Sequence, residues 1–335
     1  MLFILTGLLG IIYAILCGTY DSVRGMTALF HVDRELNKRK KQSSPNTTIR
    51  RRESDISRES TPTKISKQED EPALMTLILK LSVFNGGIFL MSVLLFEFLI
   101  LPLINIMIVS TFGEDIMMSN KYWELTKTLL TIFYQTTWVL PLLLLSKIVN
   151  CLWFQDIADK AYKYSRGRPL INQSISRIVA DSIFSILVQV LFLLQATIVE
   201  LIPLYIVGKI LGLVHMCLLY SLYTFEYKWF NMGWELHRRL SFIETNWPYF
   251  IGFGLPLAFV TQMSSSWVIN GCIFALLFPW FIVSGNEANP VTNSSQYPLH
   301  LFSPVIALSN ALFNKTIGTR FQKRKVNNTP THVRR

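Results

Sequence analysis

Polar side chains recur at helical spacing inside one of the long apolar stretches of this sequence. Asp181, Ser185 and Gln189 are spaced at i, i+4 and i+8, so they lie on one face of a predicted helix. Because an ionisable side chain is costly to bury in a membrane, such positions mark candidate functional sites. The face predicts either a pathway for an ion or small anion, or hydrogen bonds between neighbouring helices.

Two further ionisable residues extend this set of intramembrane candidates. Glu200 lies at the far end of the apolar run 178–207, and His215 lies in the next run. His215 and Glu226 are eleven residues apart, about three helical turns, and therefore share a face. A single histidine can also be an ordinary packed core residue, and both interpretations of His215 stay open.

A second group of charges falls between two apolar runs, in the segment 226–247. The pattern predicts that this segment is a cytoplasmic turn, and it contains many charges of both signs. We consider them a candidate surface for a protein partner, with a solvated loop of local salt bridges as the alternative. The residues are Glu226, Lys228, Arg238, Arg239 and Glu244.

The sequence contains no recognisable catalytic, metal-binding or cofactor-binding motif. There is no phosphate-binding loop, no nucleophile elbow and no zinc-protease motif, and the four cysteines form no CxxC pair. The net charge of +11 lies mostly beside apolar runs, as expected for charges that set membrane topology, and not in a nucleic-acid recognition module. We therefore expect a non-enzymatic protein with no cofactor and no nucleic-acid partner.

Composition indicates a polytopic α-helical membrane protein, since 51% of residues are hydrophobic and 16% are charged. About 20 residues span the hydrocarbon core. Several apolar runs are longer than one span, and Gly or Pro interrupts others. We predict an all-α bundle of long kinked helices with helical hairpins that penetrate only part of the membrane. The runs are 74–112, 128–149, 178–207, 208–225 and 250–284.

Charge and hydropathy divide the chain into four parts. The last helical region, 301–313, is too short to span and is expected to lie at the interface. The predicted parts are a hydrophobic segment at 1–20, interpreted as an uncleaved anchor, a basic and largely disordered cytoplasmic segment at 21–72, a polytopic membrane domain at 73–314 and a basic disordered tail at 315–335.

Four blocks of the sequence combine aromatic, charged and glycine residues in a specific way, as in FEYKWFN and NWPYFIGFGLP. The blocks are VFNGGIFLMSVLLFEF (83–98), WVLPLLLLSKIVNCLWFQDIADKAY (138–162), HMCLLYSLYTFEYKWFNMGWELHRRLSFIETNWPYFIGFGLPLAF (215–259) and LFPWFIVSGNEANP (277–290). These blocks resemble the etoposide-induced protein 2.4 family, also known as the ectopic-P-granules-4-type autophagy proteins.

The resemblance implies a multipass protein of the endoplasmic reticulum membrane that acts in the maturation of autophagosomes into degradative autolysosomes. It also implies a role in stress-linked growth suppression or apoptosis. The family's superfamily includes CysZ-type sulfate permeases, so a small-anion channel or permease is the alternative function. Likeness of fold alone does not establish transport.

The resemblance implies no catalytic residues. Expected partners are membrane lipids and autophagy or membrane-contact proteins, and the oligomeric state is left open.

Overall fold

The chain is described by a computed structural model that covers residues 2–43, 74–112, 120–167, 175–264 and 266–312. Within these ranges the regular structure is helical and contains no strand, which confirms the predicted all-α class. The elements are α1 (Leu2–Ser43), α2 (Leu74–Ser82), η1 (Val83–Leu90), α3 (Met91–Leu95), η2 (Phe96–Ile100), α4 (Leu101–Phe112), α6 (Asn120–Tyr134), η3 (Gln135–Val139), α7 (Leu140–Arg166), α8 (Ile175–Glu200), α9 (Tyr205–Asn231), α10 (Leu236–Thr245), α11 (Trp247–Thr261) and α12 (Trp267–Glu287).

Four helices of the described chain are long and apolar enough to cross a membrane, in agreement with the predicted polytopic fold. Two shorter apolar helices accompany them, Trp247–Thr261 and Ser303–Leu312. The second of these coincides with the segment expected at the interface. The four candidate spans are Leu74–Thr111, Ala180–Glu200, Tyr205–Asn231 and Trp267–Glu287.

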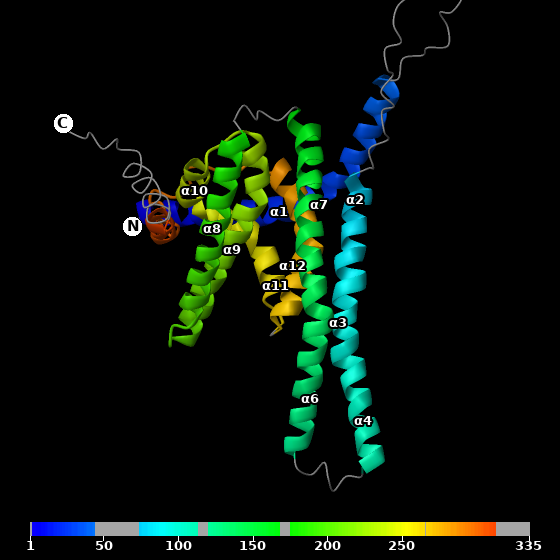
Figure 1. Cartoon of the computed structure of the whole chain (residues 1–335). Coiled ribbons are helices and arrows are strands. Elements are labelled where there is room, and N and C mark those ends of the chain that lie inside the picture. Colours follow the sequence, from blue (N-terminus) through cyan, green and yellow to red (C-terminus); the bar gives the residue numbers. More distant parts are fainter. Residues whose placement is uncertain (1, 44–73, 113–119, 168–174, 265, 313–335) are drawn as a thin grey trace, which may run out of the picture.

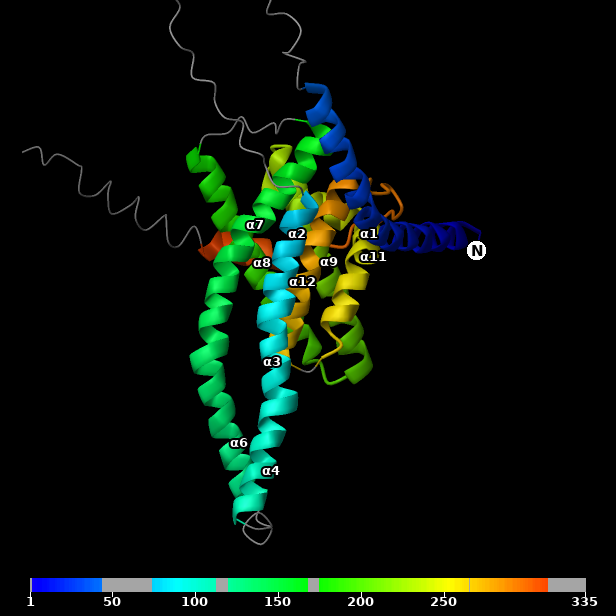
Figure 2. The same ribbon diagram turned by 90° about the vertical axis from the view of Figure 1, so that its right-hand side faces the viewer.

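The longest feature is a pair of helices that lie side by side and extend beyond the other helices (Figures 1 and 2). One runs without interruption from α2 to α4, and the other from α6 to α7, with π-helical turns η1, η2 and η3 within them. The 38 residues of Leu74–Thr111 correspond to about 57 Å of helix, well beyond a hydrocarbon core of about 30 Å. The run 74–112 therefore exceeds one perpendicular span, as predicted.

The turn between α8 and α9 is itself apolar. It comprises Leu201, Ile202, Pro203 and Leu204, and the first and last of these side chains are 77% and 64% exposed. The sequence places the junction of these two apolar runs at Pro203 and Gly208, and the break between α8 and α9 contains Pro203. Proline interrupts a helix there because it has no amide hydrogen and disfavours a helical residue before it. Exposed leucines at a turn indicate that this hairpin turns within apolar surroundings.

The predicted hairpin at 250–284 is present as α11 and α12, joined by a short turn after Thr261. Pro256 and Pro279, which interrupt the run, both lie inside helices. The two arms differ in length, since α11 has 15 residues and α12 has 21. About 15 residues of helix measure roughly 23 Å, so α11 is shorter than the hydrocarbon core is thick.

Two glycines two residues apart allow α11 to pack between two other helices. Residues at i and i+2 point to nearly opposite sides of a helix. A Cβ at Gly252 would lie 2.0 Å from the carbonyl oxygen of Ile15 in α1, and one at Gly254 would lie 2.0 Å from the carbonyl oxygen of Cys217 in α9. The GFG sequence thus acts as a helix-packing motif.

The first helix differs from its prediction in length and direction. It continues to Ser43, so residues 21–43, predicted to begin a disordered segment, are helical. Good helix formers such as Arg, Glu, Leu and Lys account for this extension. The helix is bent, and its N-terminal half runs across the other helices (Figures 1 and 2). Residues 44–72 and 315–335 lie outside the described residues, and an N-terminal anchor stays a prediction.

The close packing at Gly254 gives a testable expectation. Gly254→Ala forces α11 away from α9 and is expected to destabilise the protein by about 1–3 kcal/mol, as overpacking does. The measurement is thermal unfolding of the purified full chain in detergent. Gly271→Ala in α12 is the matched control, because a Cβ there meets nothing within 4 Å. Equal unfolding temperatures for the two variants would contradict the packing role.

Candidate functional site

The predicted polar face of α8 meets a carboxylate from α9. Ser185 and Gln189 donate hydrogen bonds to the two side-chain oxygens of Glu226, and the Gln189 amide also donates to the Ser185 hydroxyl at 3.1 Å. Ser185 is buried, and the side chain of Glu226 is 21% exposed. One member of the predicted partner surface therefore belongs to the same cluster as the intramembrane candidates.

Arg239 of α10 completes this cluster. Its Nη1 atom lies 3.3 Å from Glu226 Oε1, and its Nε and Nη2 atoms donate to the Trp234 carbonyl oxygen at 2.9 and 2.6 Å. Burial lowers the pKa of the Arg239 guanidinium, while Glu226 and Asp181 oppose that shift. An arginine stays charged in proteins, so the cluster contains a buried cation matched by acidic side chains.

The arrangement links three helices through groups that satisfy one another. The carboxylate of Glu226 receives donors from α8 and α10, and the Nε and Nη2 atoms of Arg239 donate to a backbone carbonyl. A buried ion pair needs such additional hydrogen bonds to offset the loss of hydration. Ser185 and Gln189 thus pair between helices, as in the second of the two arrangements that the sequence left open, whereas Asp181 is not part of these contacts.

His215 belongs to a different contact. Its Nδ1 donates to the Leu211 carbonyl oxygen at 2.7 Å, and its Nε2 lies 3.1 Å from the amide nitrogen of Gln195. The same amide donates to the carbonyl of Leu301, so His215 and Gln195 fasten the C-terminal segment to the bundle. Glu200 is exposed at the end of α8 and packs its side chain against Gly212.

Two other members of the predicted partner surface lie within the fold. The ammonium group of Lys228 donates to the carbonyls of Gly285 and Ala288 at 3.1 and 2.6 Å, and so satisfies the C-terminal end of α12. Glu244 accepts from the backbone amide of Phe302 at 2.9 Å and is buried. Both charges stabilise packing.

Arg238 differs from its neighbours because it is exposed, with its guanidinium 4.0 Å from the centre of the Trp234 ring. It is therefore the member of the predicted surface that is free to meet a partner, and that role stays a prediction.

Sequence reasoning did not nominate a buried amide pair that joins three helices. Asn85 of η1 and Asn150 of α7 exchange hydrogen bonds at 2.9 and 3.3 Å, and Asn85 also donates to the Ala275 carbonyl in α12 at 3.3 Å. The sequence did contain a signal for this pair. Asn85 interrupts an apolar run, and a buried polar group needs a hydrogen-bond partner.

Comparison with known proteins matches the region that contains these clusters. The sequence model of the family described as "Sulfate transporter CysZ/Etoposide-induced protein 2.4" matches residues 67–269, more than half of the chain. This chain belongs to that family. The matched region runs from just before α2 to the first turn of α12, so the Glu226–Arg239 cluster lies inside it.

Three curated relatives support this family assignment. Ectopic P granules protein 4 of Caenorhabditis elegans is 31% identical over 196 residues, which are 58% of this chain and 61% of the relative. The Protein EI24 homolog of Arabidopsis thaliana is 28% identical over 62% of this chain and 72% of its own length. The Protein EI24 homolog of Dictyostelium discoideum is 29% identical over 63% of this chain and 65% of its own length. No solved structure matches the chain.

The ion pair predicts that removing a buried charge costs far more stability than removing an exposed charge close to it. Glu226→Gln keeps the shape of the side chain but leaves Arg239 buried without its acidic partner, and we expect a loss of about 3–5 kcal/mol in unfolding free energy. Arg238→Gln, at the exposed residue beside Arg239, is expected to change stability by less than about 0.5 kcal/mol. Denaturation of the purified chain in mixed micelles provides the measurement.

The double variant Glu226→Gln/Arg239→Gln tests the coupling directly. Removing both charges is expected to cost less than the sum of the two single variants, because neither charge is then left unpaired. Additive losses, or a Glu226→Gln variant as stable as Arg238→Gln, would show that the pair is not coupled.

Proposed function

We propose that this chain is a non-enzymatic membrane protein of the endoplasmic reticulum that acts in autophagy, in the maturation of autophagosomes into degradative autolysosomes. The observation that carries the proposal is the family match over residues 67–269, since the family resembled by the sequence blocks is associated with that process. The relative named Ectopic P granules protein 4 supports it with 31% identity. The same basis extends the proposal to stress-linked growth suppression or apoptosis.

The geometry is consistent with a scaffolding mechanism. The polar groups of the bundle are used to join helices, as in the Glu226–Arg239 pair and the Asn85–Asn150 pair. The charges that remain exposed, such as Arg238, lie at the predicted cytoplasmic side. Basic segments gain about 1 kcal/mol per Lys or Arg near an anionic membrane surface. Such segments would hold membranes or autophagy and membrane-contact proteins close to the bundle.

Deletion of the gene tests this proposal. We expect degradative autolysosomes to decrease and autophagic flux to fall, with recovery when the wild-type chain is restored. Flux is measured as the turnover of an autophagosome marker with and without lysosomal inhibition. Normal flux in the deletion strain would reject the proposal. A chain carrying Arg238→Glu, which reverses an exposed charge without disturbing the buried pair, tests whether the exposed surface contributes.

The second candidate is a small-anion permease. It is favoured by the description of the matching family, which names a sulfate transporter, and by the cation of Arg239 beside the polar face of α8. In this state Arg239 is held by Glu226 and the Trp234 carbonyl, so anion binding there requires the pair to separate.

Purified chain in sulfate-loaded vesicles distinguishes the two functions. The scaffold proposal predicts sulfate efflux equal to that of protein-free vesicles across several pH values and gradients. Efflux above that background, abolished by Arg239→Gln and retained by Arg238→Gln, would instead establish the permease.

A further inference from the structure

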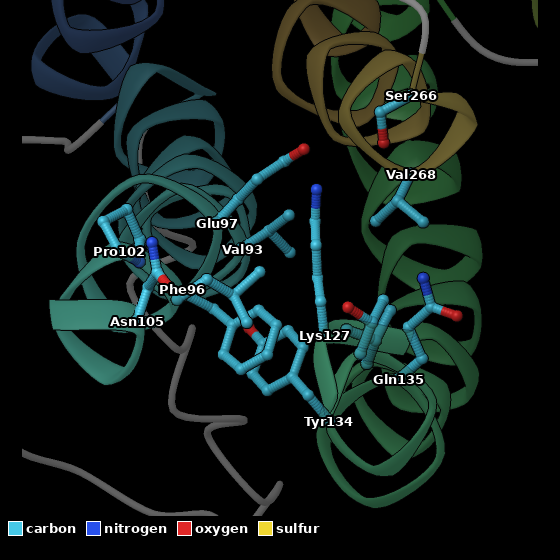
Figure 3. A pocket seen from close by; sticks show the side chains of 13 residues that line it. Val93, Phe96, Glu97, Pro102, Asn105, Lys127, Tyr134, Gln135, Ser266 and Val268 are labelled. Carbon is cyan, nitrogen blue, oxygen red and sulfur yellow. The ribbon is translucent and has the colours of Figure 1, made fainter. Parts of the chain in front are cut away.

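A cavity of about 400 Å³ lies between the long helix pair and the start of α12 (Figure 3). It is outside the Glu226–Arg239 cluster. Its lining includes one acidic and one basic side chain, Glu97 from η2 and Lys127 from α6, together with Ser266 and Val268 at the beginning of α12. A cavity of this size lies within the range of small-molecule binding sites.

The two charges are directed into the same space. Figure 3 shows the ends of the Glu97 and Lys127 side chains pointing between the two helices. Both side chains are exposed, and among the described residues no ion pair joins them to each other or to a third group. Glu97 interrupts the apolar helix Leu74–Thr111, where an oppositely charged partner stabilises an ionised side chain. Both charges are therefore available to a ligand from outside the chain.

Side-chain contacts hold the residues that form one wall of the cavity in place. The rings of Phe96 and Tyr134 stack with their centres 3.7 Å apart, and the Tyr134 hydroxyl donates to the Ser92 carbonyl at 2.8 Å. Uncharged polar side chains supply further donors and acceptors around the charges, among them Asn105, Thr131 and Gln135.

We propose that this cavity binds the headgroup of a zwitterionic phospholipid, with the phosphate at Lys127 and the ammonium at Glu97. A simple anion would be repelled by Glu97 and a simple cation by Lys127, whereas one ligand with both charges satisfies both. Charge-assisted contacts of this kind are the stronger class of hydrogen bond.

The surroundings of the cavity favour a lipid over a soluble zwitterion. Large apolar side chains beside it face outward, among them Phe98 at 70%, Phe133 at 69% and Ile106 at 64% exposure. Acyl chains cover such surfaces at no cost in hydration, while a soluble zwitterion makes no use of them. The headgroup thus occupies the polar cavity and the chains follow the apolar helix pair.

Native mass spectrometry of the full chain with defined lipids tests the proposal. The probes are phosphatidylethanolamine, phosphatidylcholine and phosphatidylglycerol with identical acyl chains. The wild-type chain is expected to retain the two zwitterionic lipids about tenfold better than phosphatidylglycerol, the effect of one charge-assisted contact. Glycerophosphoethanolamine, which has the headgroup without the chains, is expected to bind at least about tenfold more weakly, because it buries no apolar surface.

Two variants are expected to give different patterns. Lys127→Gln removes the phosphate contact and reduces retention of all three lipids, whereas Glu97→Gln reduces only the two with an ammonium group. Lys127→Arg keeps the charge and is expected to retain the preference. Lys209→Gln and Glu124→Gln, exposed charges outside the cavity lining, are the controls and should match the wild type.

Several results would overturn the proposal. Equal retention of the three lipids by the wild-type chain would show that the headgroup is not recognised. Binding of glycerophosphoethanolamine as tight as that of the lipid would identify a soluble ligand instead. If Glu97→Gln and Lys127→Gln change the oligomeric mass but not the lipid preference, the charges belong to an interface between copies of the chain. These outcomes are independent of autophagic flux.

Discussion

The ion pair between Glu226 and Arg239 sets the constraint around which the bundle is arranged. A carboxylate and a guanidinium that leave water together must find each other and fill their remaining hydrogen-bonding positions. Here the other positions are filled by Ser185 and Gln189 of α8 and by the Trp234 carbonyl. α8, α9 and α10 must therefore meet in one register, and a shift by one helical turn would separate the charges from their partners.

Other helix contacts also depend on single polar side chains or on glycines. Lys228 satisfies the carbonyls at the end of α12, and Glu244 holds the segment that follows it through the Phe302 amide. Where no polar contact is made, glycines permit backbone approach, as at Gly252 and Gly254 of α11. Apolar surface alone gives little direction to helix association in a membrane, so polar pairs and small residues determine which helices meet.

Sequence patterns predicted the helical class, the hairpin at 250–284 and the shared face of Asp181, Ser185 and Gln189, because each is a property of local spacing. They did not predict that Glu226 and Arg239 complete that face. Both lie in a charged segment that resembles a solvated loop, and their burial depends on how α9 and α10 pack against α8. The extension of α1 to Ser43 was likewise missed, because it depends on local helix propensities that hydropathy averages out.

The distribution of charge bears on the choice between scaffold and permease. Ser185 and Gln189 on the polar face of α8 are bound to Glu226, so solute movement past them requires breaking an ion pair that also holds three helices in register. A transport cycle through that position must regain the lost contacts in its other state. Glu97 and Lys127 impose no such requirement, because their charges face a cavity and are not paired with each other. A ligand can therefore approach these two charges without disturbing the helix contacts that the Glu226–Arg239 pair maintains.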